Sequence, residues 1–352
     1  MESYPEYLKG RGAQINPPNP YLKQELDVEE LDGIDEAMMP AKETEVRLEH
    51  PKKIINKVDS PDVPFSFSIN PYQGCEHGCV YCYARNAHQY WGLSAGLDFE
   101  RIIIVKENAP KLLLKELSHP KWEAAPIMFS GNTDCYQPLE RKFRLTRQCL
   151  EVLADLKHPA SVLTKNGLIL RDKDVLQELA KHDLVHAALT ITTLNEDLRR
   201  KMEPRTAPGL KRIQVVEALA KAGIPTSVML GPIIPGLNNH EFPELLQRTA
   251  DAGARAAYYT YIRLNGSIGV IFEDWIRKNY PDRAEKVLGQ IRQGHGGQVN
   301  DSTYGRRMRG AGPIADSISD AFKLFRNKYY KGREMPPYNL KAFQKPGQLS
   351  LF

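Results

Sequence analysis

Cysteine and long apolar runs are both scarce in this sequence, and each scarcity excludes a class of protein. The 352 residues contain only five cysteines, too few for a scaffold held by disulfides, so cysteine usage indicates a reducing compartment. The longest weakly polar run, 228–237, is interrupted by glycine and proline, and the amino terminus has no apolar stretch typical of a signal peptide. We therefore expect a cytoplasmic protein without membrane association.

Net charge is also low, but its distribution along the chain is uneven. The sequence has 48 basic and 43 acidic side chains, which leaves +5. Residues 1–50 carry 5 basic and 12 acidic side chains, whereas residues 283–352 carry 13 basic and 5 acidic ones. The acidic start is explained by solubility or by a regulatory role. The basic end, which has interleaved Tyr and Phe, suits contact with nucleic acid, and a solvated basic face is the alternative.

Composition and periodicity divide the chain into four parts. Early Pro and Asn residues without periodicity predict an extended acidic arm over 1–60. Short apolar runs alternate with amphipathic stretches over 61–265, and helical patterns over 266–340 predict a basic helical extension, with helices at 273–291 and 314–330. A flexible tail, 341–352, follows.

The central part reads as six strand-then-helix units. The expected strands are 65–69, 127–130, 161–164, 185–191, 226–230 and 257–262. The expected helices are 80–91 with a second piece near 111–117, then 140–156, 172–181, 210–222 and 241–252. This repetition predicts an α/β fold with a parallel sheet, a partial (β/α)6 TIM-like barrel. In such folds the functional side chains gather where the strands end, so we expect the site in the loops that follow the strands.

Three cysteines lie in the loop after the first expected strand. They have the spacing C-x3-C-x2-C and are Cys75, Cys79 and Cys82. Gly74 and Gly78 permit tight backbone turns between them. Three thiolates are one short of the ligands for a 4Fe–4S cluster, so one iron stays open to a ligand that is not protein.

A structural zinc site is the alternative for these cysteines. His77 or His88 would supply the fourth ligand. Zinc knuckles more usually have two C-x2-C pairs, and a zinc site would not explain why the loop follows a strand at the head of a β/α array.

The cysteine loop resembles the signature of the radical S-adenosylmethionine (SAM) superfamily, C-x3-C-x-aromatic-C, with Tyr81 at the aromatic position. The resemblance implies that the three cysteines bind a 4Fe–4S cluster, that the open iron binds SAM and that Tyr81 belongs to the cofactor site. It implies that an electron from the cluster cleaves SAM to methionine and a 5′-deoxyadenosyl radical, which abstracts hydrogen from a substrate. An external electron donor such as flavodoxin or ferredoxin is implied as well.

The loop after the second strand narrows the resemblance. Its sequence, S-G-N-T-D-C-Y-Q-P, stands where radical SAM enzymes usually bind the amino group of SAM through a Gly-Gly-Glu-like turn. The T-D-x-Y-Q-P pattern before an Arg-rich helix is similar to the spore photoproduct lyase-like, or DNA repair photolyase-like, family. Asn132 and Thr133 are the candidate cofactor ligands here. Capping of the next helix by Thr133 or Asp134 is the alternative.

Two further cysteines lie outside the cluster motif. Spore photoproduct lyases have a cysteine close to this turn that returns a hydrogen atom to the product radical, and the resemblance makes Cys135 the candidate for that catalytic role. In this chain the cysteine follows Thr133 and Asp134 instead of preceding the turn. Cys149, inside the expected helix 140–156, is interpreted as a buried thiol.

Later strand ends supply the remaining candidates. Lys165 follows the third strand, and the resemblance implies that it pairs with the SAM carboxylate; a solvated edge lysine is the alternative. Thr192 follows the fourth strand and offers a hydroxyl to the ribose or carboxylate. The triplet Glu203-Pro204-Arg205 is interpreted as an internal ion pair that fixes a loop.

The chain ends in Q-L-S-L-F. This string resembles the peptide by which bacterial replication and repair proteins bind the sliding clamp, and the candidate contacts are Gln348, Leu349, Leu351 and Phe352. Docking of the tail onto its own domain is the alternative.

Together these features predict a radical SAM enzyme that repairs or modifies nucleic acid, with DNA as the expected substrate and the clamp as recruiter. Radical modification of RNA, a peptide or a small molecule remains open. A non-catalytic, metal-stabilised nucleic-acid-binding module is the third possibility.

Overall fold

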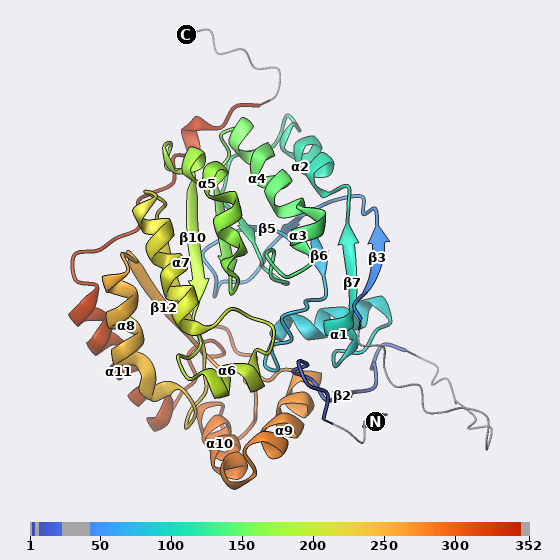
Figure 1. The fold of residues 1–352 in the computed structure, drawn as a ribbon, viewed down its shortest axis with the longest axis vertical. Helices are drawn as coiled ribbons and strands as arrows, with labels where there is room; N and C mark the ends of the chain where they lie inside the picture. The colour runs from blue at the N-terminus through green and yellow to red at the C-terminus, as the bar shows by residue number, and fades with distance from the viewer. Residues whose placement is uncertain (1, 4–6, 23–42, 346–352) are drawn as a thin grey trace, which may run out of the picture.

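Six parallel strands in chain order form the centre of the molecule (Figure 1). The structure, a computed structural model, describes residues 2–3, 7–22 and 43–345. The strands are β5 (Phe67–Ile69), β8 (Ile127–Phe129), β9 (Ala160–Thr164), β10 (Val185–Thr190), β11 (Thr226–Ile233) and β12 (Ala256–Tyr261). Each pairs with the next, and β4 (Ile55–Lys57) pairs antiparallel with β5. Among the described residues β12 pairs only with β11, so the barrel is open on one side. The predicted partial barrel is confirmed.

Helices between the strands cover the outer face of the sheet (Figure 1). They are α2 (Ala109–Leu117), α3 (Glu140–Phe143), α4 (Leu145–Asp155), η2 (Gly167–Asp172), α5 (Lys173–Ala180), α6 (Glu196–Met202), α7 (Gly209–Lys221), η3 (Asn239–Glu241) and α8 (Phe242–Asp251). Their apolar faces and the strands share one large buried cluster. The single helix predicted over 140–156 is divided, because Arg144 adopts a left-handed conformation with φ 54°.

A second, three-stranded sheet lies beside the barrel and was not predicted. It consists of β3 (Glu45–Glu49), β7 (Ile102–Lys106) and β6 (Tyr72–Gln73), with β7 in the middle. α1 (Asp98–Arg101) precedes β7, and η1 (Tyr83–Trp91), a 3-10 helix where an α-helix was expected, follows the cysteine loop. Since β6 ends just before this loop, the small sheet holds the loop from outside the barrel.

Part of the predicted N-terminal arm packs against the rest of the protein. β1 (Glu2–Ser3) and β2 (Ile15–Asn16) pair antiparallel. Residues 11–15 are buried, and Ala13 and Ile15 share a small apolar cluster with Ile271. The four-part division of the chain stays a prediction.

The C-terminal extension is helical, as expected. It contains α9 (Ser267–Asn279), α10 (Pro281–Gly294), α11 (Pro313–Tyr329) and η4 (Leu340–Ala342). The single helix predicted over 273–291 is wrong: it is divided at Tyr280, because Pro281 begins a new helix with its fixed φ and its missing N–H at the first position. None of the described helices is long and apolar enough to cross a membrane.

Residues 304–310, which we call the seam loop, bridge the open side of the barrel. At one end, the Tyr261 N–H at the end of β12 donates to the Met308 carbonyl oxygen at 2.9 Å. At the other, Asp62, between β4 and β5, accepts from the Gly305 N–H at 2.7 Å and pairs with Arg307. The seam loop therefore contacts the end of β12 on one side of the opening and the turn that precedes β5 on the other.

Candidate active site

The cysteine loop makes two sharp turns that only glycine accommodates without strain. Gly74 has φ 83° and Gly78 has φ 68°. A Cβ atom on Gly74 would lie 2.8 Å from the Ile102 carbonyl oxygen, and one on Gly78 would lie 2.7 Å from Glu100 Oε2. The turns predicted at these two glycines are confirmed, and they fold the loop back toward the strand ends.

The three loop cysteines lie together as free, largely buried thiols. Cys75 and Cys82 share a small apolar cluster with Phe99. Burial, followed by the charges of Asp134 and of the other two thiols, raises the pKa of Cys75 well above its usual range. The effect of Cys79 and Cys82 on the Cys75 thiol shows that the three lie near one another, and three cysteine thiolates are the ligands of a 4Fe–4S cluster with one open iron. This donor set fits a 4Fe–4S cluster.

The two histidines considered for zinc differ in their contacts: His77 has polar neighbours, whereas neither ring nitrogen of His88 has a hydrogen-bond partner among the described residues. His77 Nδ1 lies 3.3 Å from Asp134 Oδ2, and its Nε2 lies 3.2 Å from the Asn166 amide nitrogen. The His88 ring packs edge-on against Phe99, and burial lowers its pKa to about 4. Within residues 2–3, 7–22 and 43–345, no group of three or more His, Cys, Asp or Glu is arranged to hold a single metal ion. The contacts of His77 do not favour it as a zinc ligand.

Tyr81 ties the cysteine loop to a buried carboxylate at the end of β10. Its hydroxyl donates to Glu203, and the Thr192 hydroxyl donates to the same carboxylate at 2.6 Å. Arg212 pairs with the other oxygen of Glu203 at 2.5 Å. Although burial raises it, the pKa of Glu203 is lowered to about 2 by Arg212, Lys165 and these two hydroxyls. Glu203 is therefore ionised, and its ionic partner is Arg212, not the adjacent Arg205.

Lys165 brings positive charge to this network. Its Nζ lies 5.8 Å from the centre of the Tyr81 ring, and its charge lowers the pKa values of Cys79 and Cys82, which burial raises. The side chain thus faces the cysteine loop, as the predicted cofactor role requires. That role, like those of Tyr81 and Thr192, stays a prediction.

The loop after β8 brings its two candidates beside the small sheet. The buried Thr133 hydroxyl donates to the Tyr72 carbonyl oxygen at 2.6 Å. Asn132 is half-buried, and its amide nitrogen donates to Gln73 Oε1 at 3.0 Å. The Thr133 proton is thus used within the protein, whereas Asn132 keeps an amide oxygen that can accept a hydrogen bond.

Asp134 anchors a strand and caps no helix. One of its oxygens accepts from the Thr164 hydroxyl at 2.7 Å, and the other accepts from the Lys165 N–H at 2.9 Å. α3 begins at Glu140 after Leu139, with no side-chain cap. The alternative that Thr133 or Asp134 caps this helix is wrong, because both side chains bond to neighbouring loops.

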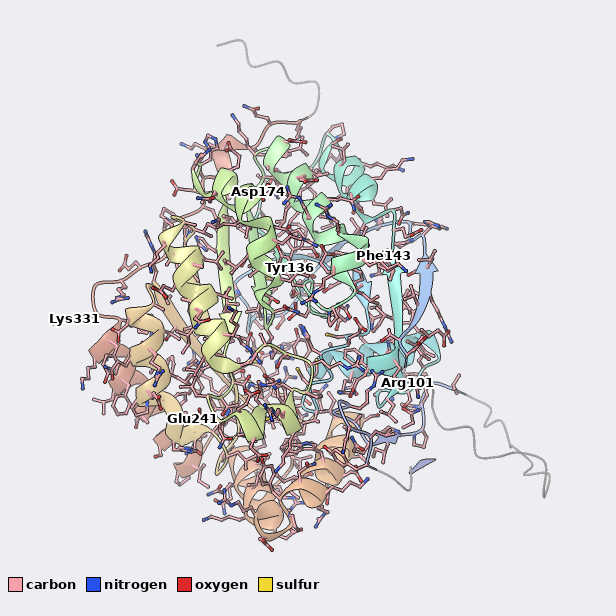
Figure 2. The ribbon with its side chains drawn as sticks, in the orientation of Figure 1. Arg101, Tyr136, Phe143, Asp174, Glu241 and Lys331 are labelled. Atoms are coloured by element: carbon pink, nitrogen blue, oxygen red, sulfur yellow. The ribbon has the colours of Figure 1, made fainter. Side chains whose placement is uncertain are left out.

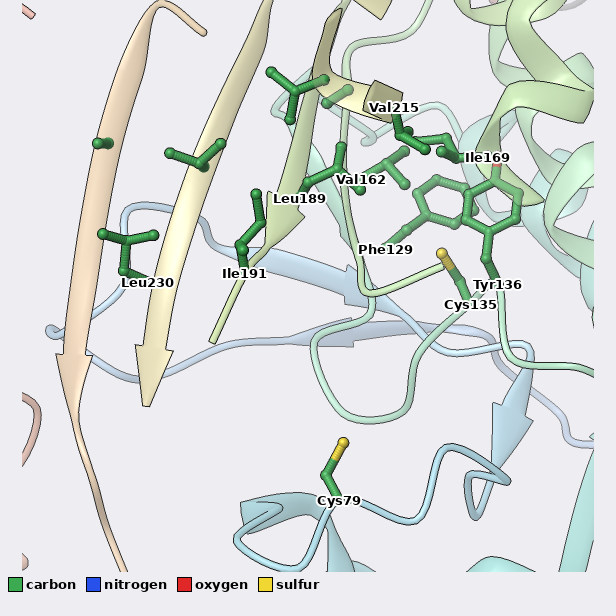
Figure 3. Packing of buried hydrophobic residues seen from close by; sticks show 14 of the residues in the cluster. Cys79, Phe129, Cys135, Tyr136, Val162, Ile169, Leu189, Ile191, Val215 and Leu230 are labelled. Atoms are coloured by element: carbon green, nitrogen blue, oxygen red, sulfur yellow. The ribbon is translucent and has the colours of Figure 1, made fainter. Parts of the chain in front are cut away.

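Cys135 lies in the hydrophobic core. Figure 3 shows it beside Phe129 and Tyr136, with its sulfur turned away from Cys79. Burial, followed by Asp134, raises the pKa of this thiol well above its usual range. The position favours a packing role over hydrogen donation. Cys149 is buried in α4 in the same cluster, as interpreted from the sequence.

A second buried ion pair, not identified from the sequence, supports the cysteine loop from outside the barrel. Arg85 pairs with Glu100 at 2.5 Å and donates to the Cys79 carbonyl oxygen at 2.9 Å. Glu100 also accepts from the Gly12 and Ala13 N–H groups at 3.0 and 2.8 Å. A Cβ on Gly12 would lie 1.7 Å from the Gly78 carbonyl oxygen. The only sequence signal for this contact is Gly12, a glycine in the charged N-terminal segment.

A carboxylate from a distant segment closes the loop after β10. After β10, the Thr193 hydroxyl and the Leu194 N–H donate to Glu241, labelled in Figure 2, and close that loop.

The four predicted clamp contacts, Gln348, Leu349, Leu351 and Phe352, lie outside the described residues. The described chain ends at Lys345, whose amine donates to the Pro120 carbonyl oxygen at 2.6 Å.

Comparison with known proteins agrees with this geometry. Residues 69–249 match the model of the radical SAM superfamily. An uncharacterized protein of Mycobacterium tuberculosis is 31% identical over 246 residues, which cover 69% of this chain and 72% of that protein. One from Methanocaldococcus jannaschii is 31% identical over 236 residues, which cover 67% of this chain and 84% of that protein. The fold is similar to that of spore photoproduct lyase complexed with dinucleoside spore photoproduct, with a TM-score of 0.59, 15% identity, and coverage of 82% of this chain and 80% of that one.

Proposed function

Because the chain belongs to the radical SAM superfamily, we propose that it uses its radical chemistry to repair or modify DNA. Membership makes it an enzyme with a 4Fe–4S cluster and SAM as cofactors, as predicted, and removes the non-catalytic module from consideration. When bound, the reduced cluster supplies the electron that cleaves SAM into methionine and a 5′-deoxyadenosyl radical.

The residues of this chain hold and orient those cofactors. Cys75, Cys79 and Cys82 would bind three irons, and the Lys165 ammonium would pair with the SAM carboxylate. The half-buried Asn132 would accept a hydrogen bond from the SAM amino group. Thr192 and Tyr81 donate to Glu203, so these two act through that carboxylate as positioning residues.

DNA as substrate is supported chiefly by where positive charge gathers. Residues 283–352 carry 13 basic and 5 acidic side chains, and part of this extension, the seam loop, contacts the end of β12. Counterion release from phosphates makes such a segment attractive to nucleic acid. The lyase of similar fold was solved with a dinucleoside photoproduct.

The decisive experiment is anaerobic reconstitution followed by a substrate screen. We expect a brown protein that cleaves SAM with dithionite and changes nucleosides in UV-irradiated or undamaged DNA. Cys79→Ala should abolish both activities, whereas the matched control Cys149→Ala, a thiol of the core, should keep them. Cleavage of SAM with change only in RNA or a peptide would contradict the DNA proposal.

Recruitment by the sliding clamp is a separate proposal, supported by the terminal string Q-L-S-L-F. Deletion of 348–352 should abolish clamp binding and leave SAM cleavage unchanged, because those residues lie outside the cysteine motif. Ser350→Ala is the matched control and should bind as the full chain does. Equal clamp affinity after deletion would defeat this proposal.

The cluster needs an electron donor, and its thiols need a reducing compartment. We expect flavodoxin or ferredoxin to reduce the cluster, since dithionite is only a laboratory substitute. A cytoplasmic location suits the chemistry, because all five cysteines are free thiols and a reducing compartment keeps them so.

A further inference from the structure

The arginines of the seam loop divide into one that is locked in place and two that face solvent. Arg307 is 17% exposed, pairs with Asp62 and donates to the Ser60 hydroxyl at 2.6 Å. Arg306 is 53% exposed and pairs with Asp301 at 3.1 Å. Arg309 is exposed, and no side-chain partner for it is found among the described residues. The first arginine builds the loop, and the other two leave their charge at the surface.

Tyr304 adds a flat aromatic surface to the same loop. Its ring lies over the Arg307 guanidinium, 4.2 Å from centre to carbon, and the residue is 56% exposed. Contact with a guanidinium fixes the ring orientation without covering the residue. An exposed, held ring beside exposed positive charges is the combination used for base stacking and phosphate contact.

The seam loop lies along the open side of the barrel and meets the barrel at the end of β12. Met308 bonds to Tyr261 at the end of β12, and its sulfur lies 3.6 Å from the Arg263 guanidinium. Burial and then the charge of Arg307 lower the pKa of Arg263, so positive groups crowd here. A partner that supplies negative charge would relieve this crowding.

We propose that the seam loop binds the phosphate backbone of a DNA strand, with Arg306 and Arg309 on phosphates and Tyr304 stacked on an unpaired base. This inference rests on the proposed function and names the surface that presents the strand. A base inside a duplex cannot reach a site at the strand ends, so the reacting nucleotide must leave the stack. Contacts to the backbone beside the barrel would hold the strand while one base enters.

The test is fluorescence anisotropy of the full-length, reconstituted protein with labelled DNA duplexes, one fully paired and one with a single unpaired thymidine. Arg306→Ala with Arg309→Ala should weaken binding about tenfold or more at low salt and reduce the salt slope by about two, one for each lost phosphate contact. Arg283→Ala with Arg326→Ala removes the same charge from α10 and α11. This control should change affinity less than about twofold.

A single substitution tests whether Tyr304 stacks on an unpaired base. Tyr304→Ala should weaken binding of the duplex with the unpaired base about tenfold and leave the fully paired duplex within about twofold. SAM cleavage without DNA should be the same in all variants, which shows that the barrel is intact.

The outcomes separate this inference from the proposed function. Equal affinity of the double variant and the unaltered protein would overturn the seam-loop inference while DNA binding itself survives. Tighter binding of an RNA duplex of the same sequence would overturn the assignment to DNA. Failure of the unaltered protein to bind any nucleic acid would overturn both proposals.

Discussion

Two buried ion pairs lie on opposite sides of the cysteine loop, and their carboxylates differ in their other hydrogen-bond partners. The outer pair, Arg85 with Glu100, lies outside the barrel, and the inner pair, Arg212 with Glu203, lies where β10 ends, beside the Thr190 carbonyl oxygen. Both have a shortest contact of 2.5 Å, and none of the four side chains is more than 1% exposed. By burial and distance alone the pairs are equivalent.

Their other partners show the difference. Glu100 accepts from backbone N–H groups at Gly12 and Ala13, so the outer pair fixes main chain. Glu203 accepts from the hydroxyls of Tyr81 and Thr192, so the inner pair fixes side chains that face the cofactor. Two similar pairs can therefore serve stability and function separately.

The largest expected effect is loss of the outer pair. Glu100→Ala should lower the free energy of unfolding by about 3–5 kcal/mol, because it leaves the Arg85 guanidinium buried without a counter-charge. Urea denaturation measures this loss. Glu217→Ala, which breaks an exposed pair with Lys221, is the matched control and should cost less than about 1 kcal/mol. Similar losses in both variants would remove the distinction between buried and surface pairs.

Acid should weaken the inner pair next. Folding lowers the pKa of Glu203 from 4.5 to about 2. At a pH above the unfolded pKa, its ionisation therefore contributes about 3 kcal/mol to the free energy of unfolding. This stability is fully present above about pH 4.5 and is lost as the pH falls toward the folded value. Urea denaturation between about pH 6 and pH 3 measures the slope. Glu203→Gln should have a shallower slope, and parallel slopes would contradict the account.

The third prediction separates function from stability. Glu203→Gln should raise the KM for SAM about tenfold, equivalent to about 1.4 kcal/mol, because it removes the charge that balances Lys165 beside the cofactor. Glu100→Gln should leave this KM within about twofold at a temperature where both variants stay folded. A rise in KM in both would show that the pairs act alike.

The smallest expected effect comes from one hydroxyl. Tyr81→Phe should cost about 1 kcal/mol, since Glu203 keeps Arg212 and Thr192 as partners, and should slow SAM cleavage. Tyr72→Phe removes a comparable hydroxyl that donates to Glu140 and should lower stability by a similar amount without slowing cleavage. Thermal denaturation and a SAM cleavage assay compare the two.

The barrel and the centre of the site could be predicted from local sequence. Each of the six expected strands overlaps an observed one, because apolar runs between amphipathic stretches define a β/α array. The expectation that loops after strands meet placed Tyr81, in the cysteine loop, near Lys165, directly after β9. Parallel topology places such residues at one end of the barrel.

Pairing between distant segments could not be predicted. β3 alternates charged and apolar residues but pairs with β7, more than fifty residues later, and no local pattern specifies that partner. Arg85 and Glu100 are 15 residues apart, and their pairing depends on the chain reversal between them, where Gly92 is left-handed with φ 75°. Cys135 follows a strand end, yet its sulfur turns into the core because the loop reverses there.

The seam loop also has a consequence for how the protein is made. Asp62 and Arg307 are 245 residues apart in sequence, and contacts of such separation form late in folding because a long chain must first close. A nascent chain that has not yet emerged past residue 307 can already contain the cysteine loop and all six barrel strands, while its side remains open. The contact between Asp62 and the seam loop can thus form only after the strands on both sides of the opening have been synthesised.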